Sequence, residues 1–153
     1  MSDYLAGKAV RKITKGIAVE RAAALIPQTD TESIFTVVGG KVLLLHIIGE
    51  VTVGIGNVAN DTRLLFNPDD AAAGNLCADL DIDDDAAGTI YTITGTPANA
   101  MQDSVNVPVA QAAEIILKPG AIQLITDANS VVGDVEWTVI YVPIDDGAYV
   151  EVA

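Results

Sequence analysis

The sequence predicts an all-β protein, an antiparallel β-sandwich of jelly-roll-like architecture. Half of its 153 residues are apolar, mostly Ala, Val, Ile and Leu, and aromatic residues are few. Short apolar and β-branched runs recur along the chain between clusters of Gly, Pro, Asn and Asp, the pattern of strands joined by turns. A chain of this length buries a core of its own within one domain.

The first 26 residues differ from the rest. The stretch "AVRKITKGIAVERAAALIP" has no clean period, and Gly7, Gly16 and several β-branched residues disfavour a helix there. Pro27 then closes the segment. We therefore predict an extended basic N-terminal arm, residues 1–26, with room for one short strand, and a β-sandwich domain, residues 27–153. The alternative is that these residues form an ordinary first strand and loop of the domain.

Strand signals follow at short intervals from residue 31. Gly39-Gly40 suits a two-residue hairpin, Asn67-Pro68 marks a strong turn, Pro108 indicates an edge position, and Pro119-Gly120 fits a type II turn between two strands. The predicted strands, in order, are "TESIFTVV", "KVLLLHIIGEVTVGI", "TRLLFN", "NLCADLDI", "GTIYTITG", "SVNVPV", "AEIILKPGAIQLIT" (two strands), "GDVEWTVIYVPI" and "AYVEV".

Charge is distributed unevenly along the chain. Residues 1–21 carry five basic and two acidic residues, a net charge of +3, whereas the remaining residues carry three basic and 19 acidic ones, a net charge of −16. The acidic body would repel phosphates, so we expect no nucleic-acid binding by the domain. Lys41, His46 and Glu50 interrupt the most hydrophobic stretch, so we expect no membrane span.

Five aspartates lie between residues 79 and 85 in "CADLDIDDDAAG". A helix-loop-helix calcium loop is excluded, because Asp84 stands where that loop needs glycine and Ile90 where it needs glutamate. The preferred interpretation is a strand whose Leu80 and Ile82 point inward and whose aspartates face solvent, which opposes unwanted strand pairing. The alternative is a sandwich-type calcium site in which neighbouring loops contribute further acids, namely Asp69, Asp70, Asp145 and Asp146.

The search for other chemistry yields no catalytic, cofactor or metal residue. His46 is the one histidine and has no serine or cysteine context, so we predict a hydrogen-bonded or interface histidine. Cys77 is the one cysteine, which excludes an internal disulfide and predicts a small buried apolar residue. Asp61, Asp127 and Asp134 lie in turn-like sequence and are predicted to form turns. We therefore expect no enzyme.

Three stretches resemble small virion proteins of tailed bacteriophages, usually encoded among head genes: "LCADLDIDDDAAGTIYTITGT", "VLLLHIIGEVT" and "VEWTVIYVPIDDGAYV". The similarity spans roughly residues 31–150. It implies a head decoration (capsid cement) protein, made in the host cytoplasm, that binds the major capsid protein on the outer surface of the virion. It also implies a homotrimer. Alternatives are a tail- or fibre-associated virion protein and a carbohydrate-binding or hydrolytic jelly-roll module.

The arm is then the expected contact with a partner, because its apolar residues can dock in a groove and its basic residues can meet acidic surfaces. We expect deletion of residues 1–21 to leave the domain folded and to abolish capsid binding. The candidate partner-binding residues are Lys8, Val10, Arg11, Lys12, Ile13, Lys15, Ile17 and Arg21.

Overall fold

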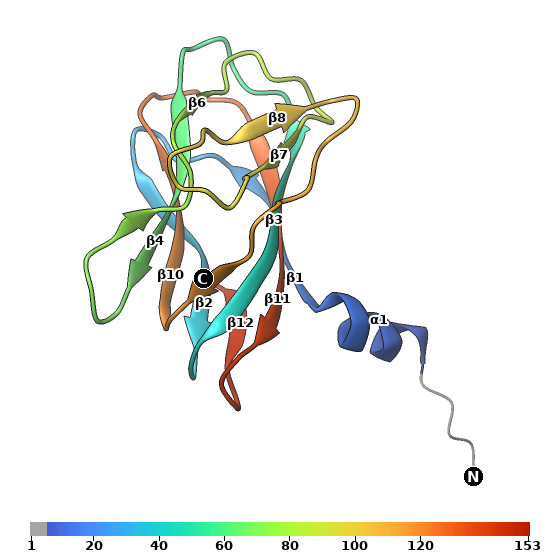
Figure 1. Cartoon of the computed structure of the whole chain (residues 1–153). Coiled ribbons are helices and arrows are strands. Elements are labelled where there is room, and N and C mark those ends of the chain that lie inside the picture. Colours follow the sequence, from blue (N-terminus) through green and yellow to red (C-terminus); the bar gives the residue numbers. More distant parts are fainter. Residues whose placement is uncertain (1–5) are drawn as a thin grey trace.

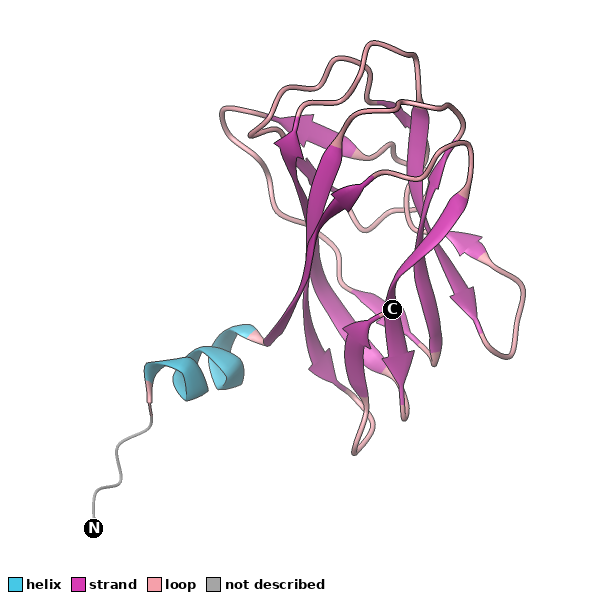
Figure 2. Ribbon diagram, turned by 180° about the vertical axis from the view of Figure 1, so that it is seen from behind, coloured by secondary structure: helices cyan, strands magenta, loops and turns pink. Residues whose placement is uncertain are grey.

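The computed structural model of the chain describes residues 6–153, and it confirms the predicted antiparallel β-sandwich (Figures 1 and 2). The elements are α1 (Gly7–Lys15), β1 (Ile17–Leu25), β2 (Thr31–Val38), β3 (Val42–Val53), β4 (Asp61–Pro68), β5 (Gly74–Asn75), β6 (Leu80–Asp81), β7 (Ile90–Thr92), β8 (Gln102–Ser104), β9 (Ile115–Leu117), β10 (Gly120–Thr126), β11 (Asp134–Pro143) and β12 (Tyr149–Val152). Sheet A has the order β1-β11-β3-β7-β8, with β9 also paired to β3. Sheet B has the order β12-β2-β10-β4-β5, with β6 also paired to β4.

The core lies between the sheets and takes alternate residues from each long strand. In β11 the inward residues are Val135, Trp137, Val139 and Tyr141, all buried as the alternation predicted. The indole of Trp137 packs over Gly49 of β3, where a Cβ atom would lie 2.7 Å from the ring. These contacts join β11 to β3, the two strands at the centre of sheet A.

The predicted hairpin at Gly39-Gly40 is wrong. The turn is present, but β2 belongs to sheet B and β3 to sheet A, so the chain crosses from one sheet to the other. The turn is held instead by the β11–β12 connection, where Asp145 Oδ2 accepts a hydrogen bond from the backbone N–H of Lys41 at 2.8 Å. A Gly-Gly pair permits the tight turn but does not specify which strand pairs with which. The turn at Pro119-Gly120 likewise links β9 of sheet A to β10 of sheet B.

The prediction of an extended arm over residues 1–26 is also wrong for most of its length; residues 1–5 lie outside the described part of the chain. Residues 17–25 form β1, an edge strand of sheet A paired antiparallel with β11, and residues 7–15 form a helix. The alternation of "IAVERAAAL" places Ile17 and Val19 against the core, and Gly16, at φ 95°, separates helix from strand. Deleting residues 1–21 would therefore remove half of a paired strand.

Candidate functional site

The helix α1 stands away from the sandwich and contributes no buried residue to it (Figures 1 and 2). Spacings of three and four residues place its four cations on one face of the helix. Val10 and Ile13 lie on the opposite face, with 42% and 73% of their surface exposed. The cations are Lys8, Arg11, Lys12 and Lys15.

The basic face of α1 looks back toward sheet A. Its four cations, together with Gly16, Ala18 of β1 and Ile140 of β11, line a groove of about 490 Å³. None of the four makes an ion pair within residues 6–153. The structure thus brings six of the eight predicted partner-binding residues together on one projecting helix.

The other two predicted residues, Ile17 and Arg21, are engaged within the domain. Ile17 packs against the core from β1. The Arg21 guanidinium is mostly buried and donates a hydrogen bond to the carboxylate of Glu32 in β2, so this ion pair ties the edge of sheet A to sheet B. These contacts remove both side chains from the exposed basic surface that the sequence predicted.

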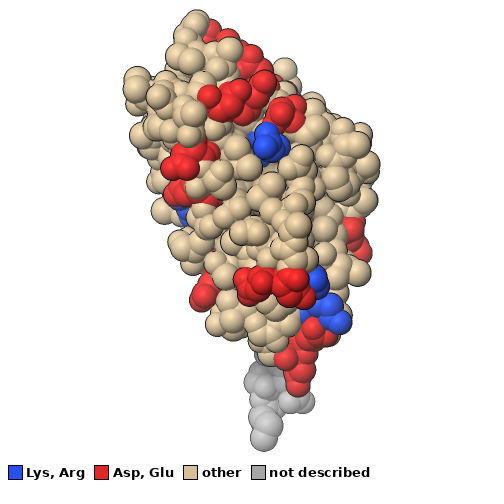
Figure 3. All heavy atoms as spheres, turned by 90° about the vertical axis from the view of Figure 1, so that its left-hand side faces the viewer, with Lys and Arg blue, Asp and Glu red and all other residues tan. Residues whose placement is uncertain are grey.

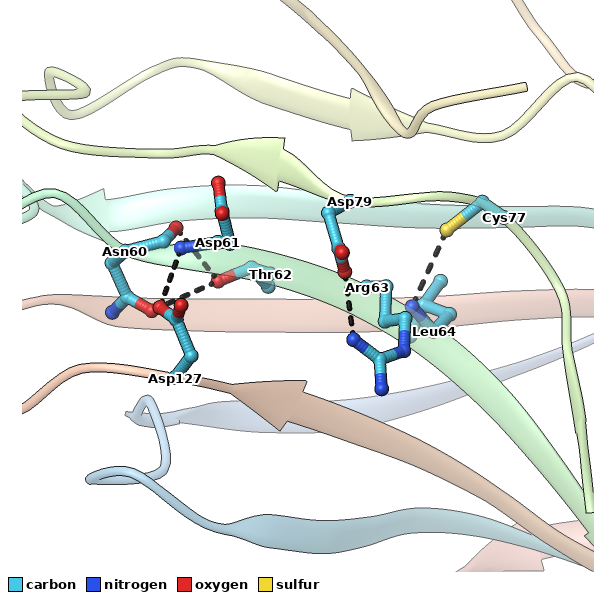
Figure 4. Close-up of polar contacts among 8 residues, drawn as sticks. All are labelled: Asn60, Asp61, Thr62, Arg63, Leu64, Cys77, Asp79 and Asp127. Carbon is cyan, nitrogen blue, oxygen red and sulfur yellow. Dashed lines mark hydrogen bonds and ion pairs between the residues drawn. The ribbon is translucent and has the colours of Figure 1, made fainter. Parts of the chain in front are cut away.

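The aspartates of residues 79–85 lie along the edge of sheet B and in the turn that follows, and they accept hydrogen bonds from neighbouring side chains and backbone; Figure 4 shows Asp79. Asp79 Oδ1 accepts a hydrogen bond from the guanidinium of Arg63 at 2.8 Å. Asp81 Oδ1 accepts the backbone N–H of Asn60 at 2.8 Å and that of Asp83 at 3.3 Å. Asp79, Asp81 and Asp83 are exposed, as the preferred interpretation requires.

The turn after this strand holds the last two aspartates. Asp84 adopts a positive φ of 56° and accepts a hydrogen bond from the Asn57 amide at 2.6 Å. Asp85 accepts the phenolic hydroxyl of Tyr91, also at 2.6 Å. Both carboxylates therefore fix the turn that leads into β7.

The alternative calcium site does not form among the described residues. The acids of the β4–β5 and β11–β12 connections lie toward the other end of the sandwich from β6 (Figure 1). Asp70 pairs with Lys118 and Asp145 with Lys41. Across residues 6–153, no three His, Cys, Asp or Glu side chains are placed to hold a metal ion together.

Asp61 and Asp127 lie beside each other in the structure. Asp127 Oδ1 accepts the backbone N–H of Asp61 at 2.8 Å, which holds the start of β4 beside the end of β10 (Figure 4). Desolvation, and next the negative charge of Asp127, raise the pKa of Asp61. Asp127 thus serves as a backbone acceptor in the bend after β10, in keeping with its predicted role in a turn. Asp61 and Asp134 instead begin β4 and β11, so the turn prediction is wrong for these two residues.

Asp85 provides the first testable prediction. Desolvation raises its pKa above the usual 3.8, and the hydrogen bond from Tyr91 only partly opposes this. The folded state therefore binds this proton more tightly than the unfolded state, and stability falls as pH rises from 3.8 through the raised pKa. We expect Asp85→Asn, which keeps an acceptor for Tyr91, to flatten the stability profile in that window. Urea unfolding at several pH values measures this, and an unchanged profile would contradict it.

Cys77 and His46 occupy ordinary structural positions. Cys77 is fully buried, its Sγ accepts the backbone N–H of Leu64 at 3.3 Å (Figure 4), and burial raises its pKa to about 11. This confirms the predicted small buried residue and makes the thiol a poor nucleophile. His46 of β3 is half-buried, and its Nδ1 has no hydrogen-bond partner in the described chain. The predicted hydrogen bond is therefore not formed at Nδ1, and the interface role of His46 stays a prediction.

A second groove, which the sequence reasoning missed, lies at the edge of the sandwich formed by the β4–β5 hairpin and β9. It has a volume of about 510 Å³. The signal for it is the pair Ile115-Ile116, because adjacent apolar residues in a strand cannot both face the core; Ile116 is 63% exposed. The lining residues are Phe66, Pro68, Ala72, Gly74, Asn75, Leu76, Gly95, Pro97, Glu114, Ile115, Ile116 and Leu117.

Figure 3 shows the molecule from the side of the β4–β5 hairpin. Acidic side chains gather toward both ends of this face, and a mainly uncharged surface separates them. The structure thus combines an acidic body with a basic helix, as the charge distribution along the sequence predicted.

No helix within residues 6–153 has both the length and the apolar character needed to cross a bilayer. Comparison with known proteins finds no matching family model, no matching curated protein and no matching solved structure.

Proposed function

We propose that the protein is a structural component of a tailed-phage virion, a head decoration (cement) protein that binds the major capsid protein on the outer lattice and stabilises the head. The observation that carries this proposal is α1, a helix with four cations, no acid and no buried residue, attached to a strongly acidic sandwich. A helix of nine residues is marginal by itself in water, so its apolar face needs a partner surface. A cement protein assembled on the capsid lattice provides such a surface.

The resemblance to phage head proteins supports the proposal from the sequence. Two of its three stretches form β3 and β11, the paired strands at the centre of sheet A, and the third runs through β6 and β7. The homotrimer follows from that resemblance alone. The carboxylates support a non-enzymatic role, because they accept hydrogen bonds from neighbouring backbone, Arg, Asn and Tyr groups, as Asp79, Asp81, Asp84, Asp85 and Asp127 do.

Cryo-EM of heads that lack the protein, after incubation with the purified full chain, tests the proposal. We expect added density over the outer lattice, at positions related by local three-fold symmetry. Density confined to the tail or to one vertex would contradict the head assignment and favour a tail-associated role. Absence from every particle, together with binding on a glycan array, would instead favour the carbohydrate-binding alternative.

A further inference from the structure

The apolar face of α1 has no partner within residues 6–153. The four cations line the groove against sheet A, so the helix turns the stripe of Val10 and Ile13 away from the domain. Ile13 is the more exposed of the two, at 73%. An exposed apolar stripe on a short amphipathic helix is the arrangement that docks into an apolar groove of another molecule.

The groove of the β4–β5 hairpin and β9 fits such a stripe. Its floor is apolar, because Leu76 and Leu117 are buried beneath it and Phe66 and Ile115 line its walls. The exposed Ile116 and Pro97 also line it.

The rim of this groove carries the opposite charge to α1. Glu114 lines it and makes no ion pair within residues 6–153, and Asp69 follows the lining residue Pro68 directly. Asp70 is neutralised by Lys118. The helix carries four cations and no acid, so its net charge is opposite to that of the rim, and the two surfaces attract each other as they approach.

A chain cannot fill its own groove with its own helix. The helix leaves from β1, which forms one edge of sheet A, whereas β9 and the β4–β5 hairpin lie at the opposite edge of the sandwich. Figures 1 and 2 show the helix and the hairpin on opposite sides of the molecule.

We propose that the apolar stripe of α1 docks in the β4–β5/β9 groove of a second copy of this chain. The contact joins two different surfaces, so it is head-to-tail, and each copy donates one helix and receives another. Repetition of such a contact closes a ring when the rotation allows it and otherwise builds an open chain. The inference deepens the proposed function, on which it rests, by naming a neighbouring copy as the partner of α1.

Light scattering of the full chain tests this contact. At about 100 µM, which populates contacts of micromolar affinity, we expect a mass at least twice the 15.9 kDa of one chain. Ile13→Asp alters the donated helix and Ile116→Asp the receiving groove, and each variant alone is expected to give the single-chain mass. Val131→Asp is the matched control, because Val131 is 81% exposed and lies in neither surface; it is expected to assemble like the unaltered chain.

Mixing the two variants gives the sharper result. Ile13→Asp keeps an intact groove and Ile116→Asp keeps an intact helix, so an equimolar mixture is expected to form one contact per pair and a mass of two chains. A mixture that stays at the single-chain mass would overturn the proposal, as would a full chain that does not assemble or an Ile116→Asp variant that assembles normally. Because Ile13 contacts no core residue, its substitution tests the contact even if Ile116→Asp lowers stability.

These experiments use the purified protein without phage heads, so they test the helix-in-groove contact independently of the proposed function. A chain that assembles in solution as described but leaves heads undecorated would refute the cement role and keep the helix-in-groove contact. A chain that decorates heads while both variants assemble normally would keep the cement role and refute the contact.

Discussion

Trp137→Ala is expected to lower the free energy of unfolding by about 3–5 kcal/mol, the usual cost of truncating a buried large aromatic side chain. Trp137 is 2% exposed at the centre of β11. Its ring stacks on Tyr91 with centroids 6.3 Å apart and packs over Gly49 of the neighbouring strand. The substitution would leave a cavity where β11, β3 and β7 meet, and Gly49 has no side chain to fill it.

Urea unfolding followed by far-ultraviolet circular dichroism measures this effect without relying on the lost indole. Thr138→Ala is the matched control, because Thr138 is the next residue of β11 and faces away from the core. We expect this control to lower the free energy of unfolding by less than about 1 kcal/mol. Equal losses in the two variants would contradict the placement of Trp137 in the core.

Gly120→Ala is expected to lower the free energy of unfolding by at least about 3 kcal/mol, because it combines backbone strain with a steric clash. Gly120 begins the central strand β10 at a φ of 154°. A Cβ atom there would lie 2.4 Å from the carbonyl oxygen of Asn67 and 2.6 Å from Cα of Pro68, which are backbone atoms of the paired strand β4. The two strands would have to separate where the chain enters sheet B from sheet A.

Two other glycines separate strain from clash in the same thermal or urea measurements. Gly147→Ala meets no atom within 4 Å but sits at a φ of 80°, so it should show the strain alone, about 1–2 kcal/mol. Gly74 has neither a positive φ nor an atom within 4 Å of an added Cβ, so Gly74→Ala should change the free energy of unfolding by less than about 0.5 kcal/mol. A Gly120 variant no less stable than the Gly147 variant would show that β4 does not approach β10 as described.

The fold class followed from the sequence because strand alternation and turn residues are local signals. The alternation in β11 correctly placed Trp137 and Tyr141 in the core, and the turn residues after Phe66 marked the end of β4. Which sheet each strand joins is not a local property, and this explains the wrong hairpin at Gly39-Gly40. The choice depends on long-range contacts such as that of Asp145 with Lys41.

The sequence analysis predicted that the basic residues of α1 form a partner surface, but it did not predict that they lie on a helix. Gly7 and the β-branched Val10 and Ile13 weaken helix propensity, yet the three- and four-residue spacing of the cations was present in the sequence. The ion pair of Arg21 with Glu32 in the other sheet could not be predicted from the sequence, because it depends on how the two sheets face each other. The β4–β5/β9 groove arises in the same way, from segments far apart in the chain.

The most direct test of the central claim, that α1 is the element of assembly on the virion, is co-sedimentation with purified heads that lack the protein. The full chain is compared with a chain that begins at Gly16, which keeps β1 whole and loses no buried residue of α1. Equal melting temperatures would confirm that the shortened chain is folded. The account predicts that the full chain sediments with the heads and the shortened chain stays in the supernatant; equal binding of the two would contradict it.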